Sequence, residues 1–159
     1  MPEQTESAKL TKQAEHLLVS GQFGGDTASR NGRVGDPIPV LNPNGARHAW
    51  FIPVTLGERI AGFFLFSPDA RLLSYSSFQH RKGELDTCPL SATWTDKKAI
   101  LQVAGKGMLD DERVRDIYLG YDGEPSRLAW VIETELPGGQ TRTLYVAGNS
   151  VWSAPKQGR

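Results

Sequence analysis

One short phrase occurs twice in this chain, as RHAWFI at residues 47–52 and as RLAWVI at residues 127–132. The two copies lie 80 positions apart and share the pattern Arg-x-Ala-Trp-x-Ile. The same shift preserves chemical class farther along, since it aligns Phe64 with Leu144. Internal similarity at a fixed spacing is typical of a duplicated structural unit. The repeat therefore predicts that the chain is built from two related units.

Each unit is predicted to begin with a helix. The apolar residues of the first helix share one helical face and are Leu10, Ala14, Leu17 and Leu18. The shorter apolar stripe of the second helix consists of Ile100, Leu101 and Ala104. Thr95 or Asp96 can cap the start of the second helix. Gly21 is expected to end the first helix, and Gly105 and Gly107 the second.

Strand candidates separated by turn residues follow each helix. In the first unit they span residues 38–41, 46–55, 59–66 and 71–75, and in the second unit 114–121, 127–136 and 141–147. Leu56-Gly57 and Asp122-Gly123 are typical of tight reversals, so neighbouring strands are expected to run antiparallel. Pro37, Pro39 and Pro53 favour edge positions or bulges for the strands of the first unit.

The predicted fold class is α+β, a duplicated unit of one helix packed on a three- to four-stranded antiparallel meander. Residues 1–80 form the first unit and residues 96–155 the second. Residues 81–95 are expected to link them, and the glycine-rich residues 24–35 to form a long loop. We expect the two units to pack together, because the predicted first sheet is apolar on both faces.

Alternation along a strand separates the two faces of each predicted sheet. In the second unit the face opposite Trp130 carries Glu133 and Glu135, which is typical of a wet surface. In the first unit the face opposite Trp50 is apolar, and it forms the candidate protein-binding face. Its residues are Phe51, Pro53, Phe63 and Leu65. Such a face is either covered within the folded chain or binds another protein or a second copy of this one.

The ionisable and nucleophilic residues form no recognisable catalytic or metal-binding pattern. His16, His48 and His80 are scattered, and Cys88 is the single cysteine, so neither an internal disulfide nor a thiolate cluster is possible. The segment 110–112, Asp-Asp-Glu, lacks the ligand spacing of a calcium loop and is expected to be a solvated turn, with Arg113 or Arg115 as possible partners. We predict no catalytic, cofactor-binding or metal-binding residue, and a protein that is not an enzyme.

The charge balance argues against nucleic acid as a partner. Lys plus Arg and Asp plus Glu number 18 each, so no net charge attracts a polyanion or an anionic membrane surface. The longest apolar run, residues 60–66, is far shorter than the roughly 20 residues of a membrane-spanning helix. We therefore expect a soluble protein without an integral membrane segment. It is cytoplasmic if the chain is complete and extracytoplasmic if a signal peptide has been removed.

Several segments are similar to one known family. KKAILQVAGKGM looks like its N-terminal helix, RLAWVIETELPGG like its strand and turn, and TRTLYVAGNSVWSA like its closing strand, while GFFLFSPDARLLSYS is a looser match in the first unit. These segments resemble the PepSY family and the related propeptide modules of secreted bacterial proteases. The stretch VAGNS at 146–150 lacks the characteristic Asp of that family. The resemblance implies a cystatin-like module that inhibits, chaperones or regulates a protease or another protein, and no catalytic residue carries over.

Two functions stay open on the sequence alone. The first is a non-enzymatic protein-binding module, an inhibitor or regulator, that uses the apolar face of the first unit. The alternative is a small-ligand-binding protein or an enzyme with a pocket between sheet and helix, lined by Trp50, Trp130 or Tyr145. A well-filled interface between helix and sheet favours the first function. A deep pocket with converging polar groups favours the second.

Overall fold

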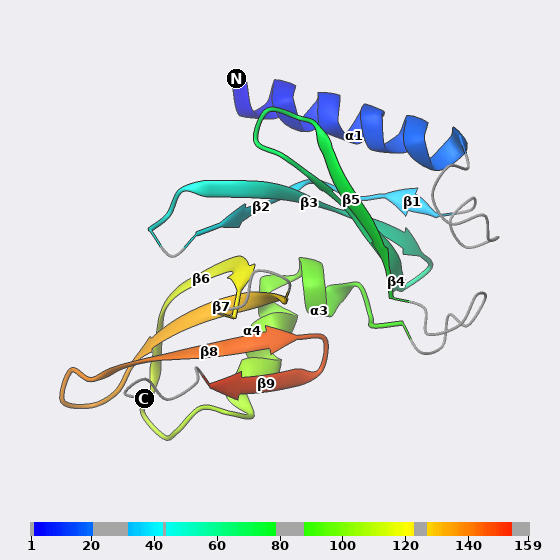
Figure 1. Cartoon of the computed structure of the whole chain (residues 1–159). Helices are drawn as coiled ribbons and strands as arrows, with labels where there is room; N and C mark the ends of the chain where they lie inside the picture. The colour runs from blue at the N-terminus through cyan, green and yellow to red at the C-terminus, as the bar shows by residue number, and fades with distance from the viewer. Residues whose placement is uncertain (1, 21–31, 43, 79–87, 123–126, 154–159) are drawn as a thin grey trace. The chain divides into compact units, whose positions relative to one another are not determined.

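The computed structural model describes residues 2–20, 32–42, 44–78, 88–122 and 127–153. In these residues the chain forms three helices and nine strands that pair mainly antiparallel (Figure 1). The predicted α+β class is confirmed. The chain divides into two compact units, Met1–Val40 with Ala46–Ser91 and Leu41–Gly45 with Ala92–Arg159. None of the described helices has the length and apolar character needed to cross a membrane.

The first unit contains one described helix and five strands. They are α1 (Pro2–Ser20), β1 (Arg33–Val34), β2 (Ile38–Leu41), β3 (Arg47–Leu56), β4 (Arg59–Phe66) and β5 (Leu72–Ser77). The long strand β3 pairs with β4, and near its end also with the short β1. Strand β5 pairs with the other side of β4 and lies at the end of the strand order. Of the two alternatives predicted for the proline-containing strands, β3 shows the bulge, which follows Pro53 between Val54 and Thr55, and not the edge position.

The core of the first unit lies between α1 and one face of β3 and β4. The predicted stripe of the helix is buried there through Leu10, Ala14 and Leu18. The strand residues of the same cluster are Trp50, Ile52, Val54, Phe64 and Phe66. Burial of one large apolar side chain stabilises a fold by about 1.5–3 kcal/mol, so this contact is the main reason for the helix to dock.

The second unit contains two helices and a four-stranded meander. They are α3 (Ala92–Thr95), α4 (Lys97–Gly105), β6 (Arg113–Tyr121), β7 (Leu128–Glu135), β8 (Thr141–Ala147) and β9 (Ser150–Ser153). The strands follow one another in space as they do in the chain. The side chain of Asp96 caps α4 by accepting a hydrogen bond from the amide of Lys98 at 3.1 Å, as predicted. The short helix α3 was not predicted.

One face of the second sheet is turned toward α4, which lies behind β7 and β8 in Figure 1. Arg142 of β8 donates a hydrogen bond to the carbonyl of Gly107, just after α4. Because side chains alternate along a strand, Leu144 and Val146 lie on the same side as Arg142, and both are buried. On the opposite side of β8 lies Tyr145.

The two copies of the repeated phrase share a strand register but not a full unit. Trp50 pairs with Phe66 and Trp130 with Val146, which is the same pairing shifted by 80 positions. The surroundings differ, because the first unit has the extra strand β1 and the second has the extra helix α3. The repeated arginine also differs in its contacts. The described residues contain no clear duplicated helix-on-meander unit, so the prediction of two equivalent units is not confirmed.

The arginine that opens each phrase has a different partner in each copy. The guanidinium of Arg47 lies over the ring of Trp50, 4.3 Å from its centroid. The guanidinium of Arg127 instead donates to a carboxylate oxygen of Asp122 at 3.0 Å. The same arginine therefore packs on a tryptophan in one unit and forms an ion pair in the other.

Two predicted connecting segments fall partly outside the described residues. Of the glycine-rich segment 24–35, only residues 32–35 are described, and they include β1 rather than a simple loop. Of the predicted linker 81–95, residues 88–95 are described and contain α3. The division between the units falls within this linker, after Ser91.

Candidate functional site

The four residues of the candidate protein-binding face lie together in the first unit. Phe51 pairs with Leu65 across β3 and β4, and Pro53 pairs with Phe63. Their exposure is low: Phe51 is 0% exposed, Pro53 is buried, and Phe63 and Leu65 are half-buried. A binding surface needs atoms that a partner can reach, and only Phe63 and Leu65 retain some.

Contacts inside the first unit account for part of this burial. The ring of Phe63 stacks on Phe51 with centroids 4.8 Å apart, and the ring of Phe78 lies tilted against Phe63 with centroids 5.4 Å apart. The amide of Gly35 donates to the carbonyl of Pro53 at 2.8 Å, and a Cβ added to Gly35 would come within 2.9 Å of the Pro53 ring. These contacts favour the alternative that the face is covered within the folded chain.

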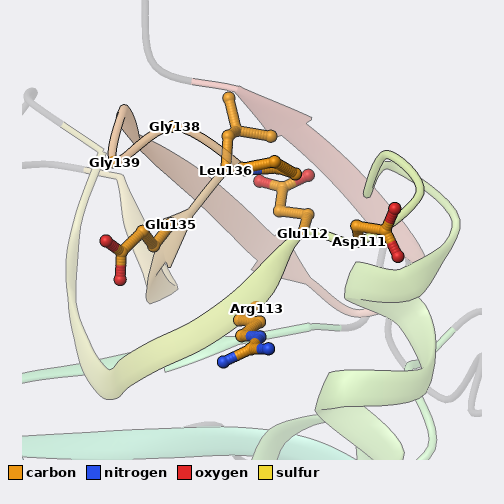
Figure 2. A pocket seen from close by; sticks show the side chains of 8 residues that line it. Asp111, Glu112, Arg113, Glu135, Leu136, Gly138 and Gly139 are labelled. Carbon is orange, nitrogen blue, oxygen red and sulfur yellow. The ribbon is translucent and has the colours of Figure 1, made fainter.

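A hollow of about 500 Å³ at the turn end of the second unit is lined by charged residues (Figure 2). Its lining residues are Asp111, Glu112, Arg113, Glu135, Leu136, Pro137, Gly138 and Gly139. Figure 2 shows Asp111, Arg113 and Glu135 pointing in three different directions. General acid–base chemistry needs groups that converge on one reacting atom. The hollow does not offer such a set.

The carboxylate of Glu112 beside this hollow is fully occupied by hydrogen bonds. Its Oε1 accepts from the amide of Leu109 at 2.8 Å and from Nη2 of Arg142 at 2.7 Å. Its Oε2 accepts from Nε of Arg142 at 3.0 Å and from the hydroxyl of Thr134. A carboxylate has about four lone-pair positions, so none is left for a substrate.

Asp110 and Asp111 are exposed and lie in a turn, as predicted, but Glu112 does not have the predicted solvated side chain. Its side chain is 0% exposed, and its partner is Arg142 rather than Arg113 or Arg115. The Arg142 hydrogen bond, aided by Thr134 and opposed by burial, lowers the pKa of Glu112 from 4.5 to about 2. The pair therefore joins the segment after α4 to β8 and acts as a structural anchor.

The second sheet carries a row of four side chains on the face turned away from α4. Pairing across the strands aligns Tyr118 with Val131, Val131 with Tyr145, and Tyr145 with Trp152. We call these four residues the aromatic row. The rings of Tyr145 and Trp152 stack with centroids 5.9 Å apart. Val131 is 4% and Tyr145 9% exposed, while Tyr118 and Trp152 at the two ends are half-buried.

The position of Tyr145 corrects one part of the sequence analysis. Tyr145 was named beside Trp50 and Trp130 as a residue that could line a pocket between sheet and helix. Trp130 faces α4, and its indole nitrogen donates to the carbonyl of Trp94 at 3.1 Å. Tyr145 lies on the opposite face with Val131 and Ala129. The two aromatic residues therefore cannot line one pocket.

Two exposed carboxylates lie directly beside the aromatic row. Asp116 pairs with Glu133 across β6 and β7, one row along from Tyr118. The pKa of Tyr118 is raised, chiefly because the side chain is partly buried and further because Glu133 and Asp116 are nearby. The pKa of Tyr145 is also raised, chiefly by burial and further by the charges of Asp122 and Glu133. Glu133 is thus close enough to act on both tyrosines.

A second hollow, of about 430 Å³, adjoins these carboxylates. It is lined by Arg115, Asp116, Glu133, Thr134, Thr141, Arg142 and Thr143. Both arginines of the lining are paired with other glutamates, Arg142 with Glu112 and Arg115 with Glu135 at 3.8 Å. Asp116 and Glu133 make no ion pair with another described residue, so they are the two carboxylates of the hollow that remain open to a cation.

The remaining residues considered in the sequence occupy ordinary structural positions. Cys88 is buried, and its carbonyl accepts a hydrogen bond from Arg59. His16 and His48 are exposed, and His80 lies outside the described residues. Among the described residues, no three His, Cys, Asp or Glu side chains are grouped so that they could hold a metal ion.

The function must therefore be argued from the aromatic row, its carboxylates and the two hollows. No protein-family model, curated protein or solved structure matches the chain.

Proposed function

We propose that this chain is a non-enzymatic protein-binding module, an inhibitor or regulator of a protease or another protein target. The observation that carries the proposal is the aromatic row on the sheet face turned away from α4. Tyrosine and tryptophan are enriched at protein interfaces because they bury a large apolar area and lose little conformational freedom. Tyr118 and Trp152 keep part of their surface accessible at the two ends of the row.

The filled interface between α4 and its sheet supports binding over the alternative of a small-ligand carrier or enzyme. On the helix, Ile100 and Ala104 are 0% exposed. On the strands, Ile132 and Val146 are 0% exposed as well. Ligand pockets are apolar hollows with a few converging polar groups. The second hollow is instead lined by charged residues and threonines, and the first has four charged residues among its eight lining residues.

The proposed surface differs from the face of Phe51 that the sequence suggested. Both surfaces have two buried and two half-buried members, so burial alone does not separate them; the aromatic row is distinguished by the exposed carboxylates Asp116 and Glu133 beside it. The aromatic row is flanked by exposed polar residues, as the rim of an interface usually is. A relation to the PepSY and propeptide modules stays part of the proposal, supported by the order of a capped helix followed by an antiparallel meander.

A capture experiment with matched variants tests the proposal. The full chain is immobilised beside Tyr118→Ala, Trp152→Ala and, as a control, Val19→Ala, whose side chain on α1 is 82% exposed. We expect the wild type and the control to retain the same protein. Each row variant should lose about 30-fold in affinity for it, the effect of a 2 kcal/mol hot-spot residue, with an unchanged melting temperature. Equal retention by all four proteins, or retention of a small molecule alone, would refute the proposal.

A further inference from the structure

We infer that the aromatic row and the adjoining 430 Å³ hollow bind a cationic segment, an extended stretch of a partner protein that carries Lys or Arg side chains. This inference rests on the proposed function and names the chemistry of the partner. It combines three observations: the charge of the hollow, the aromatic residues beside it, and the length of the row.

The charge of the hollow selects a cation. Of the four charged residues in its lining, the two arginines are already paired with glutamates that are not part of it. Asp116 and Glu133 are exposed and lie opposite each other across β6 and β7. A Lys or Arg side chain between them would gain charge-assisted hydrogen bonds to both carboxylates. The hydroxyl groups of Thr141 and Thr143 supply further acceptors in the same lining.

The aromatic residues beside the hollow favour an organic cation over a bare metal ion. A guanidinium or ammonium group is attracted to the face of a tyrosine or tryptophan ring, and its aliphatic stem packs on the same surface. Tyr118 and Trp152 offer partly exposed rings at the ends of the row. The described residues offer no third carboxylate, histidine or cysteine that would complete a metal site with Asp116 and Glu133.

The length of the row indicates the length of the segment. Tyr118, Val131, Tyr145 and Trp152 lie on four neighbouring strands. Three strand spacings of about 4.8 Å give a row of about 14 Å, and an extended chain covers that distance with about four residues at about 3.4 Å each. The segment would cross the strands from Trp152 to Tyr118 and place one basic side chain beside Glu133.

The same charges argue against a nucleic-acid strand on these aromatic rings. Stacking of bases on aromatic residues is effective when a basic groove holds the phosphates. Here the neighbouring residues are Asp116 and Glu133, which repel phosphate. This surface is therefore expected to repel a phosphate-bearing ligand.

A peptide titration tests the inference. The probes are two seven-residue peptides, Gly-Lys-Ala-Lys-Gly-Lys-Ala and its counterpart with Glu in place of Lys. The chain is labelled with 5-fluorotryptophan, and the fluorine signal of Trp152, assigned by Trp152→Phe, reports binding. We expect the Lys peptide to shift this signal in a saturable way that weakens as salt is raised, and the Glu peptide to leave it unchanged.

Variants of the carboxylates make the test specific. Glu133→Gln and Asp116→Asn should each weaken binding of the Lys peptide by about tenfold, the loss expected for one partner of a charge pair. Glu15→Gln, an exposed glutamate on α1, should leave binding unchanged. No shift with the Lys peptide at 1 mM, equal binding of the two peptides, or equal effects of all three variants would overturn the inference.

The outcome can be separated from failure of the proposed function. If the capture experiment yields a protein whose retention depends on Trp152 but not on Glu133, the aromatic row binds proteins, and the inference that the bound segment is cationic is wrong. If retention depends on neither residue, the proposed function itself is wrong.

Discussion

The ion pair of Glu112 and Arg142 predicts a loss of stability in mild acid. In the folded protein the pKa of Glu112 is lowered from 4.5 to about 2, chiefly by the hydrogen bond from Arg142. A carboxyl group with a lowered pKa stabilises the fold at every pH above its unfolded value. The contribution decreases as the pH falls below about 4.5 and is gone near pH 2, because protons then bind both states equally.

The size of this contribution follows from the same values. A fall in pKa from 4.5 to about 2 corresponds to about 3 kcal/mol of unfolding free energy. The Arg142 side chain is 26% exposed, so solvent screens the pair and reduces the expected figure to roughly 1–2 kcal/mol. Less than half of the contribution should remain at pH 3, since the unfolded chain is already protonated there.

Urea unfolding at a series of pH values measures the effect. The assay compares the wild type with Glu112→Gln, which keeps most of the shape but removes the charge, and follows tryptophan fluorescence from pH 7 to pH 3. The wild type should be more stable by roughly 1–2 kcal/mol at pH 7, and the difference should shrink steadily below pH 4.5. Glu135→Gln is the matched control, because its pair with Arg115 at 3.8 Å is exposed and is expected to contribute little. A difference that stays constant over the whole pH range, or an equal effect in the control, would refute the reasoning.

Three further substitutions test the packing. Gly62→Ala should destabilise the first unit by about 2 kcal/mol, because the added Cβ would meet the hydroxyl of Tyr75 on β5, whereas Gly105→Ala meets nothing within 4 Å; thermal melts of both variants check this. Trp130→Phe should cost about 1–2 kcal/mol in urea unfolding, since it leaves a buried carbonyl of α3 without its donor, and an unchanged midpoint would contradict this. Phe51→Glu should unfold the first unit, with a loss of about 3 kcal/mol or more visible by circular dichroism, and a stable variant would mean that its face can be exposed.

Local patterns in the sequence were sufficient to predict most of the longer helices and strands. The predicted ranges 38–41, 59–66 and 141–147 agree with β2, β4 and β8, because alternation of apolar residues between turns is a local property. Asp96 was predicted as a cap for the same reason. The short elements β1, α3 and β9 were not predicted, since two to four residues carry too little periodicity.

The pairings that shape the candidate surface are not local. Glu112 and Arg142 are 30 positions apart, and no pattern around either residue indicates the other. The aromatic row needs β9, because Trp152 enters it only through pairing with β8. Alternation could show which residues share the face of Phe51. It could not show what covers that face, because Phe78 and Gly35 come from outside the two strands.

The repeated phrase now gives a physical reason for the location of the proposed binding surface. In the first copy the residues that point away from the core are Phe51 and Pro53, and both are buried. At the same positions, 80 residues later, the second copy has Val131 and Glu133. An unpaired buried charge is costly, so a carboxylate can take the position of this buried proline only in a copy in which that position is exposed. Glu133 is exposed, so the second copy leaves open the register position at which the first copy buries Pro53, and Glu133 lies on the face that carries the aromatic row.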